Sequence, residues 1–399
     1  MKILAIETSC DDTCVALAQA KGNNFSILKE IISSQVEVHK KWGGVFPSLA
    51  KREHQKNIVP ILKDVLGQPR LNKKTLISQN KLRILKKILE RDKELEKRLI
   101  PFLQKSKIPN LDLIAVTQGP GLEPCLWVGV NTAKALSFFW NVPLIGINHI
   151  EAHIFVNFLV NNRLICPEFV EGSIINNYLP AICLVVSGGH TQLVLMKGLF
   201  KYKILGETRD DAAGEAFDKI ARILGLPYPG GPAIARLAAQ KLSIINNQLS
   251  IKLPRPMIHS KDYDFSFSGL KTAVLYDFKK RPKTIQKSKE YKIMMAKEVQ
   301  EAIIEVLVSK TLRAAKEFKA KSIILGGGVT ANKRLREVFH KKLLKFTKPP
   351  LLFVPEPKLS TDNASMVAIT GYLRYKYFGS KDWQNLSADA NLKLGEAKI

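Results

Sequence analysis

Two histidines and one distant aspartate have the residue types and the spacing of ligands for a catalytic metal ion. His149 and His153 are four residues apart, so on a helix their imidazoles lie on one face. Asp362 can add a carboxylate. Three protein ligands leave coordination positions free for a substrate, as a catalytic metal site requires. Because many histidine pairs with this spacing bind nothing, the metal site depends on support from other motifs.

Two hairpin patterns indicate the elements that would position these residues. Apolar segments 3–9 and 14–18 flank a polar turn, and segments 180–186 and 192–196 flank a turn of sequence Ser-Gly-Gly-His-Thr. Further helix and strand signals follow each hairpin, which predicts two α/β lobes. We expect an N-terminal lobe over residues 1–148 and a C-terminal lobe over 149–399, whose last helix can return to the N-terminal lobe.

Glycine-rich turns follow several predicted strands and suggest a nucleotide site. These turns lie at residues 119–121, 187–189, 230–232 and 326–328. At the end of a strand, such a turn lets backbone amides approach phosphate oxygens, and several turns together favour a nucleotide cleft between the lobes. The chain contains neither a Walker lysine motif nor Gly-x-Gly-x-x-Gly, which excludes the P-loop and Rossmann classes.

Acidic residues near a predicted helix add to this hypothesis. Asp210 and Asp211 directly precede the helix and are suited to cap it. Asp218 lies further along the helix, close to Gly231 in sequence. It is therefore the better candidate to accept hydrogen bonds from ribose hydroxyls, although a surface ion pair explains it equally well.

Composition points to an acidic partner. The formal net charge is +27, from 62 Lys and Arg against 35 Asp and Glu. A protein with this charge produces a positive electrostatic field, whose natural partner is a polyanion such as nucleic acid. A lysine-rich composition spread over all surfaces is the alternative. Thirteen Lys or Arg but four Asp or Glu fall between residues 70 and 107, where leucines follow helical spacing. This predicts a basic helical insertion at about 67–108 that either contacts RNA or caps the lobe.

Cysteine usage and hydropathy predict the compartment. The five cysteines are odd in number, form no Cys-x-x-Cys pair, and therefore predict a reduced environment without structural zinc. The sequence contains no run of 18 apolar residues, so we expect a cytoplasmic protein that does not span a membrane.

Taken in order along the chain, these motifs resemble the tRNA N6-adenosine threonylcarbamoyltransferase family. The matching segments are residues 6–11, 39–54, 149–153, 186–191, 210–219, 228–232, 264–271, 326–329 with 332, and 361–363. The resemblance covers nearly the whole chain. It implies a duplicated fold of the actin-like, Hsp70-like and sugar-kinase-like class, with an active site between the lobes.

The resemblance also implies roles for individual residues. His149, His153 and Asp362 would bind one divalent ion, iron(II) in first place and zinc as the alternative. The adenylate part of threonylcarbamoyl-AMP would be held by Val185, Val186, Ser187, Gly188, Gly189, Asp218, Gly231 and Asn332. The family moves the threonylcarbamoyl group onto N6 of adenosine 37 in tRNAs that read codons beginning with A, and AMP leaves. Its usual partners are a paralogous subunit of the same fold and a small ATPase.

Asp11, at the tip of the first hairpin, is the candidate catalytic residue. A carboxylate there could orient or deprotonate the amine of adenine, and an Asx-turn is the structural alternative. Asp12 follows where the family commonly has Glu.

Three other functions remain open. A metalloprotease is disfavoured, because Glu151 follows His149 by two residues, whereas His-Glu-x-x-His places the glutamate directly after the first histidine. A non-catalytic paralogue would lack the paired histidines, and an ATP-driven sugar kinase would not need His149.

Overall fold

The computed structural model describes residues 1–22, 24–67, 77–160, 163–164, 177–241, 251–380 and 382–395. Contacts within the chain divide it into two compact units. Unit 1 comprises Met1–Glu37, Val45–Ile174 and Asp362–Ile399, and unit 2 comprises Val38–Gly44 and Ile175–Thr361. The predicted boundary at residue 148 differs from this division, because α6 (His149–Phe155) and the described residues as far as Leu164 belong to unit 1. The last helix, α14 (Ala364–Phe378), also belongs to unit 1, as expected for a helix that returns to the N-terminal lobe.

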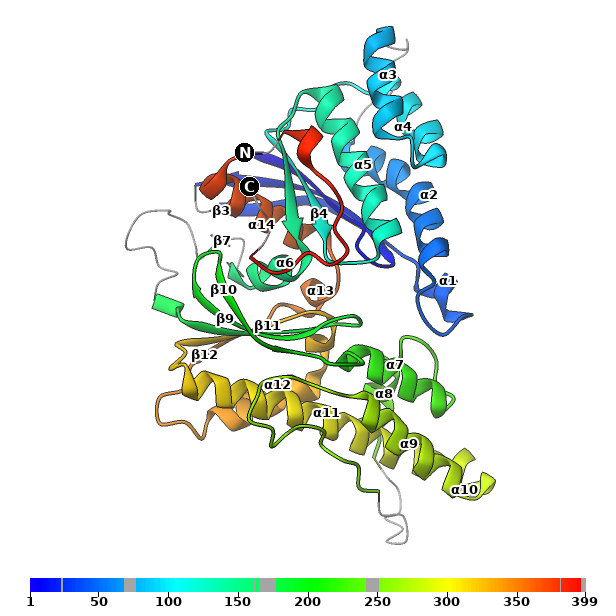
Figure 1. Ribbon diagram of the computed structural model, residues 1–399, viewed down its shortest axis with the longest axis vertical. Coiled ribbons are helices and arrows are strands. Elements are labelled where there is room, and N and C mark those ends of the chain that lie inside the picture. The colour runs from blue at the N-terminus through cyan, green and yellow to red at the C-terminus, as the bar shows by residue number, and fades with distance from the viewer. Residues whose placement is uncertain are drawn as a thin grey trace. The chain divides into compact units, whose positions relative to one another are not determined.

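Unit 1 is built on one mixed sheet with the strand order β5-β4-β1-β2-β3-β7-β6 (Figure 1). The strands are β1 (Lys2–Glu7), β2 (Asp12–Lys21), β3 (Asn24–Ser34), β4 (Leu113–Gly119), β5 (Leu144–Asn148), β6 (Leu159–Val160) and β7 (Arg163–Leu164). β1 pairs antiparallel with β2 and parallel with β4, which in turn pairs parallel with β5. Apolar side chains of β1 and β4 are buried along nearly their whole length, as expected for strands covered on both faces.

Helices cover both faces of this sheet. α2 (Pro47–Leu66) and α5 (Glu123–Trp140) contact each other and pack on β2 and β4, respectively. α14 contacts β1, β2 and β4 and also α6 (His149–Phe155), which follows β5 without a loop. The remaining helices of unit 1 are α3 (Gln79–Ile88), α4 (Lys93–Lys105), η1 (Val156–Phe158) and η4 (Trp383–Asn385), and α1 (Val36–Lys40) spans the border of the two units in the sequence.

Unit 2 repeats the same sheet. Its strands are β8 (Ala181–Val186), β9 (Thr191–Gly198), β10 (Lys201–Glu207), β11 (Ser322–Gly326) and β12 (Leu351–Phe353). Their order, β10-β9-β8-β11-β12, and their directions match those of β3-β2-β1-β4-β5 in unit 1. The predicted duplicated α/β fold of the actin-like class is therefore confirmed.

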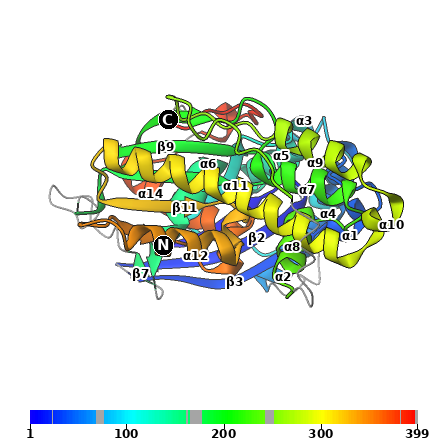
Figure 2. The same ribbon diagram turned by 90° about the horizontal axis from the view of Figure 1, so that it is seen from below.

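The helices of unit 2 are α7 (Ala213–Ile223), α8 (Gly230–Ala238), α9 (Ser268–Lys280), α10 (Lys283–Lys287), α11 (Lys289–Glu317), η3 (Gly328–Ala331), α12 (Lys333–Leu343) and α13 (Pro357–Ser360). In Figure 2 the long α11 runs beside α12, which it contacts, and it packs on β8. None of the described helices has the length and apolar character needed to cross a membrane.

The expected capping of α7 by Asp210 is wrong. The N-cap position of α7 is Ala212, which makes no side-chain cap. Asp210 instead accepts hydrogen bonds from the backbone N–H groups of Phe267 and Ser268, at 2.8 and 3.2 Å, and so satisfies the start of α9. Strand β10 ends at Glu207, and the bridge between Thr208 and Phe265 brings these distant segments together. Asp211 forms an ion pair with Lys219 at 2.5 Å.

Candidate functional site

The junction of β5 and α6 places both histidines. Asn148 ends the buried strand β5 and caps α6, because its side-chain oxygen accepts hydrogen bonds from the N–H groups of Ile150 and Glu151 at 2.9 and 3.2 Å. The helix therefore begins at His149, and His153 lies one turn later on the same face, with 4.7 Å between the two ring centroids. Both imidazoles are buried.

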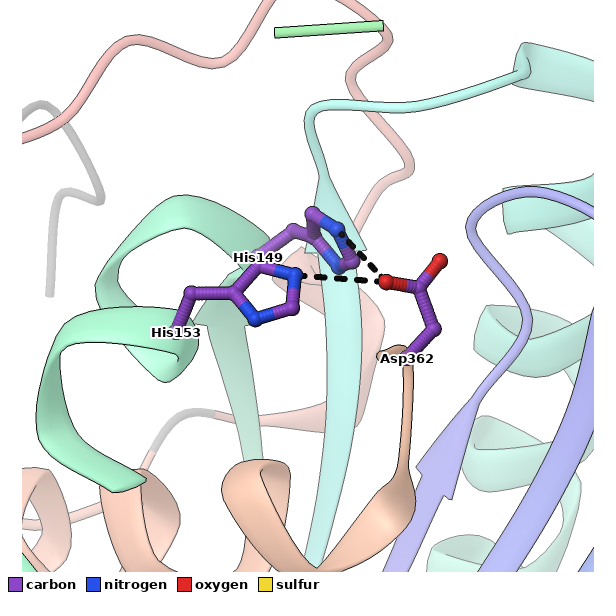
Figure 3. A group of neighbouring side chains, drawn as sticks. All are labelled: His149, His153 and Asp362. Atoms are coloured by element: carbon purple, nitrogen blue, oxygen red, sulfur yellow. Dashed lines mark hydrogen bonds and ion pairs between the residues drawn. The ribbon is translucent and has the colours of Figure 1, made fainter. Parts of the chain in front are cut away.

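Asp362 reaches the same place from the other end of the chain. It directly precedes Asn363, whose side chain caps α14 by accepting a hydrogen bond from Met366 N at 2.8 Å. Asp362 Oδ1 lies 3.2 Å from His153 Nε2 and 3.5 Å from His149 Nε2 (Figure 3). One ligand atom from each of the three residues lies within 4.8 Å of the others. All three belong to unit 1, so the predicted trio is brought together within one compact unit.

Glu7 orients His149, a role that no local sequence pattern predicted. Glu7 ends β1 and is fully buried, and its Oε2 lies 3.2 Å from His149 Nδ1. The carboxylate also accepts hydrogen bonds from Ser9 N and Thr117 Oγ1, each at 2.5 Å. A carboxylate at Nδ1 keeps the proton on that nitrogen and turns Nε2 toward Asp362, so that Nε2 can ligate a metal ion in place of its own proton.

The electrostatics of the site favour a bound cation. Burial disfavours the charged imidazole of His149, but Asp362 and Glu7 outweigh burial and raise the pKa of His149 to about 9. Burial lowers the pKa of His153, with a smaller opposing effect from Asp362. Burial also opposes ionisation of Glu7, yet the neighbouring His149 lowers the pKa of Glu7 below its ordinary value. Two imidazoles and the carboxylate of Asp362 are a donor set that fits a divalent transition metal, and Glu7 adds a second negative charge beside His149.

Asp11 lies in the turn between β1 and β2, in the same unit as the histidines. His54 of α2 holds this turn: its Nε2 lies 3.0 Å from the carbonyl oxygen of Cys10, and its Nδ1 lies 2.8 Å from Thr13 Oγ1. With the proton on Nε2, His54 donates to Cys10 and accepts from Thr13, so it links both sides of the turn. His54 is thus a structural support for Asp11, a role that its position in the sequence did not reveal.

The predicted phosphate-binding turn follows β8 in unit 2. Ser187 N donates to the carbonyl oxygen of His190 at 2.8 Å, and Ser187 Oγ accepts from His190 N at 3.1 Å. Gly188 and Gly189 are exposed, and a Cβ atom added at either would meet nothing within 4 Å. Val185 and Val186 lie buried at the end of β8, where they contribute backbone groups only. The backbone of Gly188 and Gly189 in unit 2 is therefore accessible to a ligand.

A second glycine turn lies directly beside the first. Gly327 has a φ of +88°, and a Cβ atom there would lie 2.4 Å from the carbonyl oxygen of Val186. Only glycine fits this close approach between the ends of the parallel strands β8 and β11. The carboxyl ends of adjacent parallel strands are where ligands bind in α/β sheets.

The other predicted nucleotide residues have structural partners of their own. Asp218 Oδ1 accepts a hydrogen bond from Gly230 N at 2.6 Å, which places Gly231 at the start of α8 beside α7. Asn332 caps α12 through Leu335 N at 3.1 Å and donates to Gln300 Oε1 at 2.9 Å. Both residues help to build the part of unit 2 that surrounds the glycine turns. Asp218 belongs to α7, and Asn332 directly follows η3, which contacts β8 and α7.

Solved structures resemble the chain only distantly. An activator of 2-hydroxyisocaproyl-CoA dehydratase from Clostridium difficile has a TM-score of 0.45 and 10% sequence identity, and the match covers 94% of this chain and 96% of that chain. YeaZ from Pseudomonas aeruginosa has a TM-score of 0.35 and 8% identity over 97% of this chain and 98% of that chain.

Sequence comparisons are far more specific. The family model of TsaD, tRNA N6-adenosine threonylcarbamoyltransferase, matches residues 26–77 and 102–369. The protein of that name from Persephonella marina is 41% identical over 99% of this chain and 96% of its own length. The one from Thermosipho melanesiensis is 40% identical over 99% of this chain and 100% of its own length. The chain therefore belongs to the tRNA N6-adenosine threonylcarbamoyltransferase family.

Proposed function

We propose that the protein transfers the threonylcarbamoyl group of threonylcarbamoyl-AMP to N6 of adenosine 37 in tRNAs that read codons beginning with A. Its membership in a transferase family supports this reaction. The observation that carries the proposal is the convergence of His149, His153 and Asp362, a set that supplies an open site for one divalent ion. We propose iron(II) as this ion, with zinc as the alternative.

The reaction exchanges one bond for another. N6 of adenosine forms a bond to the carbamoyl carbon, the bond from that carbon to the phosphate oxygen breaks, and AMP leaves with the electron pair. A bound divalent ion supplies positive charge that polarises the acyl donor. Because the amine loses a proton, a base is needed, and we assign this role to Asp11, held on its turn by His54.

The residues of unit 1 prepare the ligand set. Glu7 holds the Nδ1 proton of His149 and so leaves Nε2 available, while Asn148 and Asn363 fix the helix starts that carry the ligands. In unit 2 we propose that the backbone amides of Gly188 and Gly189 bind the phosphate of the adenylate. Val185, Val186 and Ser187 would complete that turn, and Asp218, Gly231 and Asn332 would hold the ribose and base.

The protease alternative conflicts with the surroundings of Glu151. Its Oε2 lies 2.7 Å from Arg374 Nη1, and both side chains are buried. A carboxylate engaged in a buried ion pair is poorly suited to activate a metal-bound water. We therefore favour the transferase over a metalloprotease.

We further propose that a paralogous subunit and a small ATPase assist the reaction, and that it takes place in the cytoplasm. The test is incubation of the purified protein with threonylcarbamoyl-AMP and unmodified tRNA, with and without these partners, followed by mass spectrometry of the nucleosides. We expect product with the wild type and at least a hundredfold less with His153→Ala.

His340→Ala provides the matched control, because His340 is an exposed residue of α12. This variant should form as much product as the wild type. Absence of product from the wild type under every condition would refute the proposed function, and full activity of His153→Ala would refute the role of the metal ligands.

A further inference from the structure

The helices α3 and α4 form an insertion that is firmly anchored in unit 1. Their apolar side chains point into the core of the unit, and they contact α2 and α5. The buried anchors are Leu85, Leu89, Leu95, Leu99, Phe102 and Leu103. Burial of this many large apolar side chains fixes the orientation of the insertion. The polar side of the insertion is therefore presented in a defined position.

Polar contacts strengthen the anchoring. Asp92, between the two helices, is buried and accepts hydrogen bonds from Gln55 and Asn131 at 3.1 and 2.8 Å. Lys51 of α2 balances its charge at 2.9 Å. A buried aspartate with three partners from α2 and α5 holds the insertion at a fixed place on these helices.

α3 carries positive charge that no described acidic side chain balances. α3 contains Lys81, Arg83, Lys86 and Lys87, all exposed, and no acidic residue. Within the described part of the chain, none of these four forms an ion pair. On α4, by contrast, lysines pair with neighbouring glutamates: Lys93 with Glu96 at 2.9 Å and Lys97 with Glu94 at 2.6 Å. The unbalanced charge is thus concentrated on α3.

Charge alone does not single out α3, because the whole chain is basic, with a net charge of +27. The family match does: it omits residues 78–101, which include all of α3. The insertion is therefore an addition to a family framework that already supplies the chemistry. Its apolar side is explained by anchoring. Of its basic residues, Lys81 lies over the ring of Phe139, but none of the four forms an ion pair with a described residue of unit 1.

We propose that the outer side of α3 binds the phosphate backbone of the tRNA substrate, away from the nucleotide that is modified. This inference rests on the proposed function, which makes tRNA the substrate. Lysine and arginine side chains bind phosphates through charge and release counterions, without reading sequence. The contact lies away from the modified nucleotide because α3 and α6 lie at opposite ends of unit 1 (Figure 1).

The experiment replaces Lys81, Arg83, Lys86 and Lys87 by Gln and measures binding and transfer with two RNAs, the full-length tRNA and its isolated anticodon stem-loop. We expect the affinity for full-length tRNA at about 0.15 M salt to fall about tenfold or more. The slope of log Kd against log salt concentration should fall by about two to four, roughly one for each lost phosphate contact. KM for full-length tRNA should rise similarly with kcat unchanged, and KM for the stem-loop should not change.

The control carries the same loss of charge on another helix and the segment after it. Lys341, Lys342, Lys345 and Lys348, at and after the end of α12, are exposed and are replaced by Gln together. We expect this variant to bind tRNA within about threefold of the wild type. The double variant Lys86→Gln, Lys87→Gln alters only two exposed side chains, and should show about half of the change in slope even if the fourfold variant folds poorly.

Three outcomes would overturn the inference. The first is equal weakening by the α3 and α12 variants, which would indicate a diffuse field. The second is unchanged binding of full-length tRNA by the α3 variant. This outcome would overturn the inference even if the variant had lost binding to an acidic protein or to anionic vesicles. The third is equal weakening for the stem-loop and the full tRNA. If the wild type transfers no threonylcarbamoyl group to any tRNA, the proposed function fails instead, and binding still tests the α3 surface.

Discussion

Replacing Glu7 by Gln tests whether this carboxylate positions a metal ligand or only fills the core. The side chain is fully buried and receives three donors, from Ser9 N, Thr117 Oγ1 and His149 Nδ1. Gln has the same shape but presents an NH₂ group in place of one oxygen, so one donor loses its acceptor. The metal affinity should fall about 10- to 100-fold, as for other groups that orient a metal-bound histidine. The free energy of unfolding should fall by about 2 kcal/mol.

The assay is titration of metal-free protein with Co²⁺, whose visible absorption reports its coordination, beside urea unfolding of the same samples. Thr117→Val provides the control, because it removes one hydrogen bond to Glu7 but keeps the carboxylate at His149. The control should lose about 1 kcal/mol of stability and bind Co²⁺ within about threefold of the wild type. If Glu7→Gln is less stable but binds Co²⁺ as tightly as the wild type, Glu7 is a structural residue and the reasoning is refuted.

Three further predictions concern buried ionisable groups. Burial and the nearby charge of Asp11 raise the pKa of Asp12 to about 7, which is above the value in the unfolded chain. Between about pH 4 and pH 7 the folded chain therefore holds one proton more than the unfolded chain. The free energy of unfolding of the wild type should decrease over this range. Asp12→Asn should remove this decrease and be more stable at pH 8 by of order 2 kcal/mol in urea unfolding, and a pH-independent difference would contradict the assignment. Arg374→Met should lower the free energy of unfolding by about 3–5 kcal/mol, because it leaves Glu151 buried without its partner. The double variant with Glu151→Leu should recover most of that loss in urea unfolding. A single variant as stable as the wild type would argue against the ion pair. Burial and the charge of Asp11 raise the pKa of the Cys125 thiol to about 12. Alkylation of Cys125 at pH 7.5, followed by peptide mass spectrometry, should therefore be about 100-fold slower in native than in urea-unfolded protein. Equal rates would contradict the burial of this thiol.

Local spacing predicted those parts of the fold and the site that depend on neighbours in sequence. The interval between His149 and His153 predicted one helix face, and α6 confirms it. The leucine spacing predicted a helical insertion, which α3 and α4 confirm, although residues 68–76 of it lie outside the described residues. Cys166 also lies outside them, and the four described cysteines form no disulfide. The two hairpins predicted the duplication, because each strand pattern includes its own polar turn.

Features that depend on distant pairing were not accessible in this way. Glu7 reaches His149 because β1, β4 and β5 are adjacent in the sheet, an order that spacing along the chain does not specify. The position of Asp210 just before α7 predicted a helix cap there, but the bridge between Thr208 and Phe265 places Asp210 at the start of α9. Residues 149–160 and 163–164 belong to unit 1, whereas the strand that ends at Asn148 predicted a boundary there.

The most direct test of the central claim is elemental analysis of the purified, active protein, with the transfer assay run on the same samples. The wild type and His340→Ala should each contain about one iron or zinc per chain and form product, whereas His149→Ala with His153→Ala should contain neither ion and form at least a hundredfold less product. An active wild type without bound metal, or a double variant that forms product at the wild-type rate, would contradict the claim.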